Sequence, residues 1–202
     1  MGTRHLITVV SDSKHRIAQY GQWDGYPSGQ GVGVLKFLSD GNLEALKRNA
    51  LKCSFISNDE YKELTKDYTN ESAGEFFNKY PQFSRDTGSD ILSIVANADE
   101  GLKLWDDYNF AADSLFCEWA YVIDFDKNTF EIYEGFNDKP LDAHERFFGM
   151  ICPRYSDKEK ASDIYYPVKH KKTFSLEELP TTEEFLYELE PHDENEADEA
   201  VG

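Results

Sequence analysis

The sequence predicts an α+β domain, with a mostly antiparallel sheet built from an N-terminal and a C-terminal hairpin around a central helical block. Residues 5–10 (HLITVV) carry apolar side chains on both faces of a strand, as a strand covered on both sides does. Residues 117–125 alternate with the period of two that a strand requires. Between these segments, apolar residues recur three and four positions apart, which is the period of helices.

Length and charge predict one domain with a tail. The chain has 202 residues, of which 40% are hydrophobic and 14% aromatic, enough to build one packed core. We expect residues 1–189 to form this single α+β domain. Residues 190–202 are expected to form a disordered acidic tail, because they contain six carboxylates and no lysine or arginine follows Lys172.

The N-terminal part is expected to hold a hairpin followed by two helices. The first strand turns through residues 11–13 into a second strand over residues 14–20, and its apolar faces place it in the middle of the sheet. Residues 34–38 predict a helix that ends near Gly41. A second helix is predicted by a stripe of residues three and four apart, namely Leu43, Leu46, Lys47, Ala50 and Leu51.

Capping motifs predict the central helices. Ser57-x-x-Glu60 and Ser72-x-x-Glu75 have the spacing of capping boxes, in which the two residues satisfy free amide groups at a helix start. Pro81 is expected to end the second of these helices, because proline interrupts helical hydrogen bonding. A further helix is expected within residues 88–98.

The clearest local pattern is a hairpin over residues 117–136. Its alternation places Trp119 in the core beside Tyr121. The turn consists of residues 126–128, and Asn128 tolerates the left-handed conformation that a three-residue connection needs.

Two elements are expected after this hairpin. Residues 164–168 predict a strand that continues through Phe174, and Pro167 favours the edge of the sheet because it donates no hydrogen bond. Thr181-x-x-Glu184 has the capping-box spacing and predicts a last short helix.

Residues 19–31, here called the aromatic-glycine loop, are the most informative segment for function. They hold two tyrosines, a tryptophan, an aspartate, three side-chain amides and four glycines. Glycines let another molecule approach the backbone closely, while aromatic and amide groups supply flat surfaces and hydrogen bonds. We therefore expect this loop to bind a small polar ligand or a host protein.

Polar residues from other segments are expected to complete the site. We expect Arg4 to form its floor and residues 85–86 or 113–118 to form the opposite wall. Arg4 or Arg85 would pair with the carboxylate of Asp24, Asp113 or Glu118. If two of these carboxylates converge near Trp23, one with a raised pKa would perform acid–base chemistry; the alternative is that the ion pairs only fasten loops onto the sheet. The predicted site residues are Arg4, Tyr20, Gln22, Trp23, Asp24, Tyr26, Arg85, Asp113 and Glu118.

Composition argues against several classes of function. The three cysteines and five histidines have no metal-ligand spacing, so we predict neither a metal site nor a cofactor. The net charge of −18 repels phosphate backbones and disfavours direct nucleic-acid binding. The apolar runs are far shorter than the roughly 20 residues of a membrane-spanning helix, and the N-terminus lacks the apolar core of a signal peptide. A cytoplasmic protein without membrane contact is therefore expected.

Several segments of the chain form a distinctive set: GTRHLI at residues 2–7, AQYGQWDGYPSGQG at residues 18–31, SRDTG at residues 84–88, FAADSLFCEWAY at residues 110–121, and the ending that runs from YPV at residues 166–168 through LPT at residues 179–181. This set resembles a family of small uncharacterised proteins seen in phage, bacterial and fungal genomes. The resemblance covers nearly the whole predicted domain. It implies no particular activity and transfers no catalytic residue.

Two classes of function remain after these observations. An acidic surface suits an accessory protein of a phage or mobile element that occupies a basic groove of a host protein or sequesters a small nucleotide. The alternative is a hydrolase similar to the αββα amidohydrolases, whose nucleophile is the first residue of the chain. Removal of Met1 would expose Gly2, which has no nucleophilic side chain.

Overall fold

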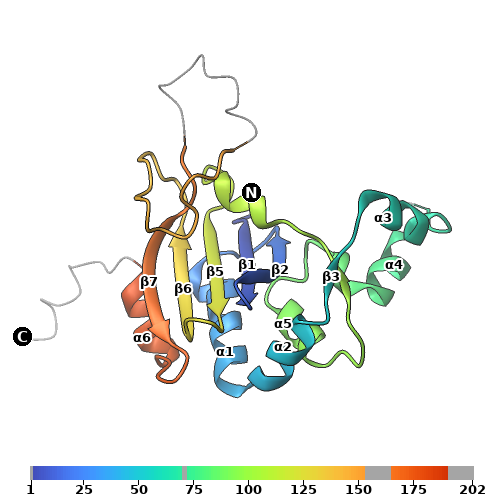
Figure 1. Cartoon of the computed structure of the whole chain (residues 1–202), viewed down its shortest axis with the longest axis horizontal. Coiled ribbons are helices and arrows are strands. Elements are labelled where there is room, and N and C mark those ends of the chain that lie inside the picture. Colours follow the sequence, from blue (N-terminus) through green and yellow to red (C-terminus); the bar gives the residue numbers. More distant parts are fainter. Residues whose placement is uncertain (1, 70–71, 153–164, 191–202) are drawn as a thin grey trace, which may run out of the picture.

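The computed structural model describes residues 2–69, 72–152 and 165–190. Its main feature is a five-stranded sheet in the order β2-β1-β5-β6-β7 (Figure 1). The strands are β1 (His5–Ser11), β2 (Lys14–Gly21), β5 (Trp119–Asp124), β6 (Thr129–Glu134) and β7 (Lys169–Ser175). A separate two-stranded sheet pairs β3 (Ser54–Phe55) with β4 (Lys103–Leu104). Together with the helices, this arrangement confirms the predicted α+β class.

The main sheet is antiparallel except at its centre. The β1–β2, β5–β6 and β6–β7 pairs are antiparallel, whereas β1 and β5 run parallel. The two predicted hairpins thus share one sheet that is mostly antiparallel, as expected, and their neighbouring strands β1 and β5 run parallel. The physical reason lies in the connection. His5 pairs with both Gly21 and Trp119, so the helical block returns the chain to the end of the sheet where β1 begins.

Helices cover one face of this sheet. They are α1 (Val32–Asp40), α2 (Leu43–Ala50), α5 (Asp90–Ala96) and α6 (Thr182–Leu189). Their buried side chains pack against Ile7, Val9 and Tyr121 in the larger of two core clusters. All seven residues of β1 are buried, which confirms its predicted central position. In Figure 1, α6 lies beside β7, and the pair α3 (Asn58–Thr65) and α4 (Ala73–Lys79) lies at the opposite end of the molecule.

The second face of the sheet packs against a smaller core. Leu6, Val122 and Tyr133 meet Phe147 there, and the short helix η3 (Tyr108–Ala112) adds Ala111. Within the described residues, no second large sheet covers this face. The layers therefore differ from the two stacked sheets of an αββα hydrolase.

Two of the three predicted capping boxes form. The Ser57 and Thr181 side chains each accept the amide hydrogen of the glutamate three residues later, and that glutamate bonds back to the cap residue. Ser72 also precedes a helix, α4, but its side chain makes no cap bond to that helix. Its hydroxyl instead accepts the amide hydrogen of Thr69 at 2.8 Å, a local bond that competes with capping.

Other sequence-based boundaries hold to within a few residues, with two exceptions. Asn128 has φ of +58°, which confirms the turn, and β7 is an edge strand as Pro167 indicated. However, β7 begins only at Lys169, because the preceding amides bond elsewhere: Tyr166 donates to Asn137 and Val168 to Ala111. Ile164, the first residue of the predicted strand, lies outside the described residues.

The second exception is the face on which Cys117 lies. Alternation predicted that Cys117 would share a face with Trp119 and Tyr121. The structure places Cys117 before β5 begins and in the core of the opposite face. Trp119 itself is only partly buried.

The predicted tail falls mostly on residues 191–202, which lie outside the described residues. Glu190, its first residue, is described, and its side chain contacts the aromatic-glycine loop. The Glu190 Oε1 accepts hydrogen bonds from the Ser28 amide at 2.9 Å and from the Ser28 hydroxyl at 2.5 Å. None of the helices in the described ranges has the length and apolar composition needed to span a bilayer.

Candidate functional site

The aromatic-glycine loop packs closely against the end of the sheet. The Gly25 amide donates to the Thr3 carbonyl at 2.9 Å, and the Gly25 carbonyl accepts the buried Tyr121 hydroxyl at 2.8 Å. The Gln30 amide donates to the Asp24 carbonyl at 2.8 Å. Asp24 has φ of +54°, a left-handed conformation that aspartate adopts more readily than most residues. The loop is therefore held in one conformation by bonds to β5 and to the segment before β1.

Two glycines of this loop are required by His5. A Cβ at Gly21 would lie 2.0 Å from Cε1 of the His5 ring, and a Cβ at Gly25 would lie 2.8 Å from both the His5 Cβ and the Thr3 carbonyl. His5 is 1% exposed, and neither ring nitrogen has a hydrogen-bond partner among the described residues. Burial lowers the pKa of His5 to about 4, so the ring is neutral near pH 7. Sequence reasoning missed His5, because its contact with Gly21 depends on strand register.

Neither Asp24 nor Glu118 forms the predicted ion pair with an arginine side chain among the described residues. Asp24 accepts the Tyr26 hydroxyl at 3.2 Å. Glu118 accepts the Arg4 backbone amide at 3.2 Å, so the contact with Arg4 exists but involves the main chain. Asp113 ends η3, where its carbonyl accepts the amides of residues 116 and 117.

The loop contributes to two different pockets, one at each end. Its first part lies against the segment 84–86: the Gln22 amide donates to the Arg85 carbonyl at 3.0 Å, and the Trp23 indole donates to Asp86 at 2.8 Å. Tyr20 and Arg85 line one pocket of about 340 Å³, here called the Tyr20 pocket. Its other lining residues are Gln19, Phe83, Trp105 and Asp107. The predicted meeting of loop and Arg85 is thus seen in the structure.

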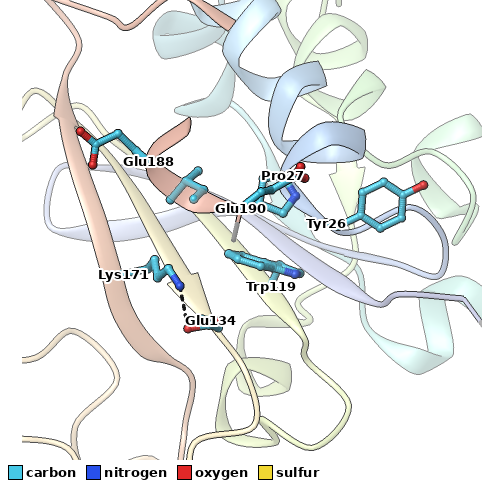
Figure 2. A pocket seen from close by; sticks show the side chains of 8 residues that line it. Tyr26, Pro27, Trp119, Glu134, Lys171, Glu188 and Glu190 are labelled. Atoms are coloured by element: carbon cyan, nitrogen blue, oxygen red, sulfur yellow. Dashed lines mark hydrogen bonds and ion pairs between the residues drawn. The ribbon is translucent and has the colours of Figure 1, made fainter. Parts of the chain in front are cut away.

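The second pocket, here called the Trp119 pocket, has a volume of about 600 Å³. Its lining residues are Tyr26, Pro27, Trp119, Glu134, Lys171, Glu188, Leu189 and Glu190. Figure 2 shows the Trp119 indole between the Glu134–Lys171 pair on one side and Tyr26 on the other. Tyr26 is the only predicted site residue that lines this pocket.

Trp119 is partly exposed because it lies at the start of β5, near the end of the helix that covers this face. It lies on the helix-covered face beside Tyr121, but at the first position of β5. Helix α6, which covers the adjoining part of this face, ends at Leu189. A partly exposed indole in a pocket keeps a large apolar surface available for contact with another molecule.

Charged groups surround the indole. Glu134 lies 3.2 Å from the Lys171 ammonium and 3.8 Å from that of Lys169. Glu188 lies 2.7 Å from the ammonium of Lys172, which does not line the pocket. Three carboxylates and one lysine line the pocket, and two of these carboxylates, Glu134 and Glu188, are already paired with lysines, whereas Glu190 accepts from Ser28.

The C-terminal end of α6 adds to the negative character. A helix end of this kind presents unsatisfied carbonyl groups and favours lysine or arginine nearby. Helix α6 has no basic residue in its last turn, and instead carries Glu188 there and Glu190 at its C-cap. This arrangement opposes the local electrostatic preference of the helix, as is common where a binding function requires it. It is also the sequence signal by which the pocket was detectable.

A bulge in the edge strand places Lys171 at this pocket. Ile132 pairs with Lys172 and Tyr133 pairs with His170, so Lys171 is an extra residue that has no backbone pairing partner on β6. An extra residue of this kind redirects side chains. It allows Lys171 to reach Glu134 on the Trp119 side, while His170 lines another pocket with Tyr133.

Neither pocket contains an evident metal site. No group of three or more histidine, cysteine, aspartate or glutamate side chains is placed to hold a metal ion in residues 2–69, 72–152 and 165–190.

Comparison of the chain with protein-family models, curated protein sequences and solved structures gives no match. The function must accordingly be argued from the geometry of the two pockets.

Proposed function

We propose that this protein is a cytoplasmic accessory protein that binds a basic side chain of a partner protein in the Trp119 pocket. The observation that carries the proposal is the partly exposed indole of Trp119 beside carboxylates at the negative end of α6. An indole face, a carboxylate and a helix C-terminus each attract cations. The aromatic-glycine loop supplies the remaining wall through Tyr26 and Pro27.

The charge of the whole protein supports a basic partner. A net charge of −18 produces a long-range field that accelerates encounter with a positively charged surface and repels an acidic one. The guanidinium group of arginine fits the site particularly well, because it is planar and stacks on aromatic faces while its edge bonds to carboxylates. A free small-molecule amine carries only one positive group, so it gains less from this field than a partner surface that carries several.

Lys171 indicates how such a group would be held. Its ammonium lies 3.2 Å from Glu134, Lys171 lines the same pocket as Trp119, and the Lys171 and Glu134 side chains are about one-third exposed. A partner guanidinium would bond to Glu190 on the other side of Trp119. Glu190 already accepts hydrogen bonds from the amide and the hydroxyl of Ser28, which belongs to the aromatic-glycine loop. A guanidinium that bonds to Glu190 would therefore also affect the position of this loop.

The proposal predicts binding of N-acetyl-arginine amide, observed as a saturable shift of the Trp119 indole resonance in NMR spectra. The citrulline analogue has the same shape without charge and should give no such shift. For a single side chain the dissociation constant should be about millimolar. Glu190→Gln should weaken binding by roughly tenfold, since it removes the charge but keeps an oxygen that accepts from Ser28.

Glu177→Gln is the matched control, because Glu177 is exposed and does not line the pocket. It should leave the affinity for the arginine probe unchanged at constant ionic strength. Equal binding of the citrulline analogue, or equal affinities of the Glu190→Gln and Glu177→Gln variants, would contradict the proposal. If butylammonium bound as tightly as a basic peptide, the ligand of this pocket would be a small amine and not the side chain of a partner protein.

A further inference from the structure

The Tyr20 pocket lies beside two arginine side chains that have little internal charge compensation. The Arg85 side chain is 66% exposed, and its closest acidic contact is Asp86 at 4.0 Å, the limit of an ion pair. That aspartate also accepts the Trp23 indole N–H at 2.8 Å. The Arg4 guanidinium stacks on the Phe116 ring at 4.3 Å, and its Nε is buried without a hydrogen-bond partner among the described residues.

Both arginines act on the Tyr20 hydroxyl. Burial raises the pKa of Tyr20, and the positive charges of Arg4 and Arg85 oppose this shift. The hydroxyl donates to the Gln22 side-chain oxygen at 2.5 Å, which fixes its direction. The guanidinium groups of Arg4 and Arg85 thus outnumber the one carboxylate, that of Asp107, that acts on the same hydroxyl. Guanidinium groups bind anions by charge-assisted hydrogen bonds, even on a protein whose net charge is −18.

The walls of the pocket suit a flat ring. Phe83 and Trp105 lie edge to face with their ring centroids 5.7 Å apart, and Tyr20 forms a third aromatic surface. The volume of about 340 Å³ is at the lower end of ordinary ligand sites and accommodates one ring system. Aromatic side chains bind nucleobases by stacking, which contributes roughly 1–3 kcal/mol per base.

Asp107 supplies a hydrogen-bond acceptor at the end of the pocket near β2. Its Oδ2 accepts the Tyr20 amide at 3.2 Å, and its own amide donates to the Ala18 carbonyl at 3.1 Å. The carboxylate is thereby fixed, and further acceptor positions remain on its oxygens. Gln19 is fixed in the same way, since its side-chain nitrogen donates to the Ser84 carbonyl at 3.1 Å. A ring that carries N–H groups would find acceptors here.

We infer that the Tyr20 pocket binds a nucleoside monophosphate, with the base against Phe83 and Trp105 and the phosphate at the guanidinium groups. Arg85 would contact the phosphate directly, and Arg4, which does not line the pocket, would add its charge from a greater distance. The exocyclic and ring N–H groups of the base would donate to Asp107. This site is separate from the Trp119 pocket and takes a ligand of opposite charge.

Isothermal titration with AMP, adenosine, ribose 5-phosphate and inorganic phosphate tests this inference. AMP should bind at least tenfold more tightly than any of the three fragments, because only AMP engages both the aromatic walls and the arginines. GMP, CMP and UMP should identify the preferred base. If no mononucleotide binds, or if inorganic phosphate binds as well as AMP, the inference is wrong.

Arg85→Gln separates the role of the charge from that of the pocket walls. The Arg85 side chain is largely exposed, so this variant should fold normally, lose roughly tenfold in AMP affinity and bind adenosine as the wild type does. Arg48→Gln removes an equally charged, exposed residue of α2 and should not change AMP affinity. Equal AMP affinities of the two variants would overturn the assignment of the phosphate to Arg85. Glu190→Gln should leave AMP binding intact, which distinguishes the two pockets.

Discussion

Arg146→Met is expected to lower the free energy of unfolding by about 3–5 kcal/mol at neutral pH, the loss typical of breaking a buried ion pair from one side. Arg146 joins two strands on the second face of the sheet. Its Nε and Nη2 donate to the two Glu131 oxygens at 2.7 and 2.8 Å, and Nη2 also bonds to Asp124. Asp124 and Glu131 are 2% and 5% exposed. The variant would leave the buried Asp124 without its cation and Glu131 with only the more distant Lys127, at 3.8 Å.

The pH dependence of this loss gives a second readout. Burial by itself would raise the pKa of Glu131, but hydrogen bonds from Arg146 and Tyr133 lower it to about 2. In the wild type, Glu131 therefore stabilises the fold above pH 4.5, and this contribution is lost as the pH falls toward 2. Without Arg146, burial dominates and the folded-state pKa rises. The difference between variant and wild type should then begin to shrink above pH 4.5, as the raised pKa of Glu131 in the variant is passed, and should shrink further below pH 4.5 as wild-type Glu131 loses its contribution.

Urea denaturation at pH 7 and pH 4 measures both effects. Lys62→Met is the control, because the Lys62–Asp59 pair has side chains 77% and 94% exposed and should contribute less than about 1 kcal/mol. Removing all three charges at once, with Asp124→Asn, Glu131→Gln and Arg146→Met, should recover part of the loss. A destabilisation of Arg146→Met no larger than that of Lys62→Met would show that water reaches the two carboxylates.

The wild-type protein is also expected to lose about 3 kcal/mol of stability between pH 6.5 and pH 4 through His5 alone. Burial lowers the pKa of His5 from 6.5 to about 4. A lowered folded-state pKa means that protons bind the unfolded chain more tightly. The contribution of neutral His5 is therefore complete above pH 6.5 and is lost as the pH falls toward 4. Because Gly21 and Gly25 pack on its ring, a charged His5 would also displace the aromatic-glycine loop.

His5→Phe keeps an aromatic ring that cannot be protonated. Between pH 6.5 and pH 4, this variant should therefore lose about 3 kcal/mol less free energy of unfolding than the wild type. His144→Phe, a change at an exposed histidine, should retain the wild-type dependence. Denaturant midpoints measured at half-unit steps from pH 7 to pH 4 provide the comparison. Parallel curves for His5→Phe and wild type would mean that His5 is hydrated in the folded state.

Sequence reasoning succeeded where the determining contacts are local. The capping boxes at Ser57 and Thr181 and the left-handed Asn128 depend on groups a few residues apart, and all three are present. The failure at Ser72 has the same origin, since Thr69 offers its amide as an equally close partner. The loop residues Tyr20 and Gln22 do lie near Arg4 and Arg85, because the start of β1 and the end of β2 are hydrogen-bonded neighbours.

The sequence by itself determined the α+β class, the central position of β1 and the location of the hairpins, since side-chain periodicity and turn residues carry this information. Only the tertiary structure decided that β1 and β5 run parallel, that His5 lies under Gly21, and that Arg146 meets Asp124 and Glu131. These contacts join segments whose separation along the chain follows no rule. Trp119 shows the limit most clearly: alternation assigns it to the covered face, but how much of that face α6 covers depends on where the helix ends in space.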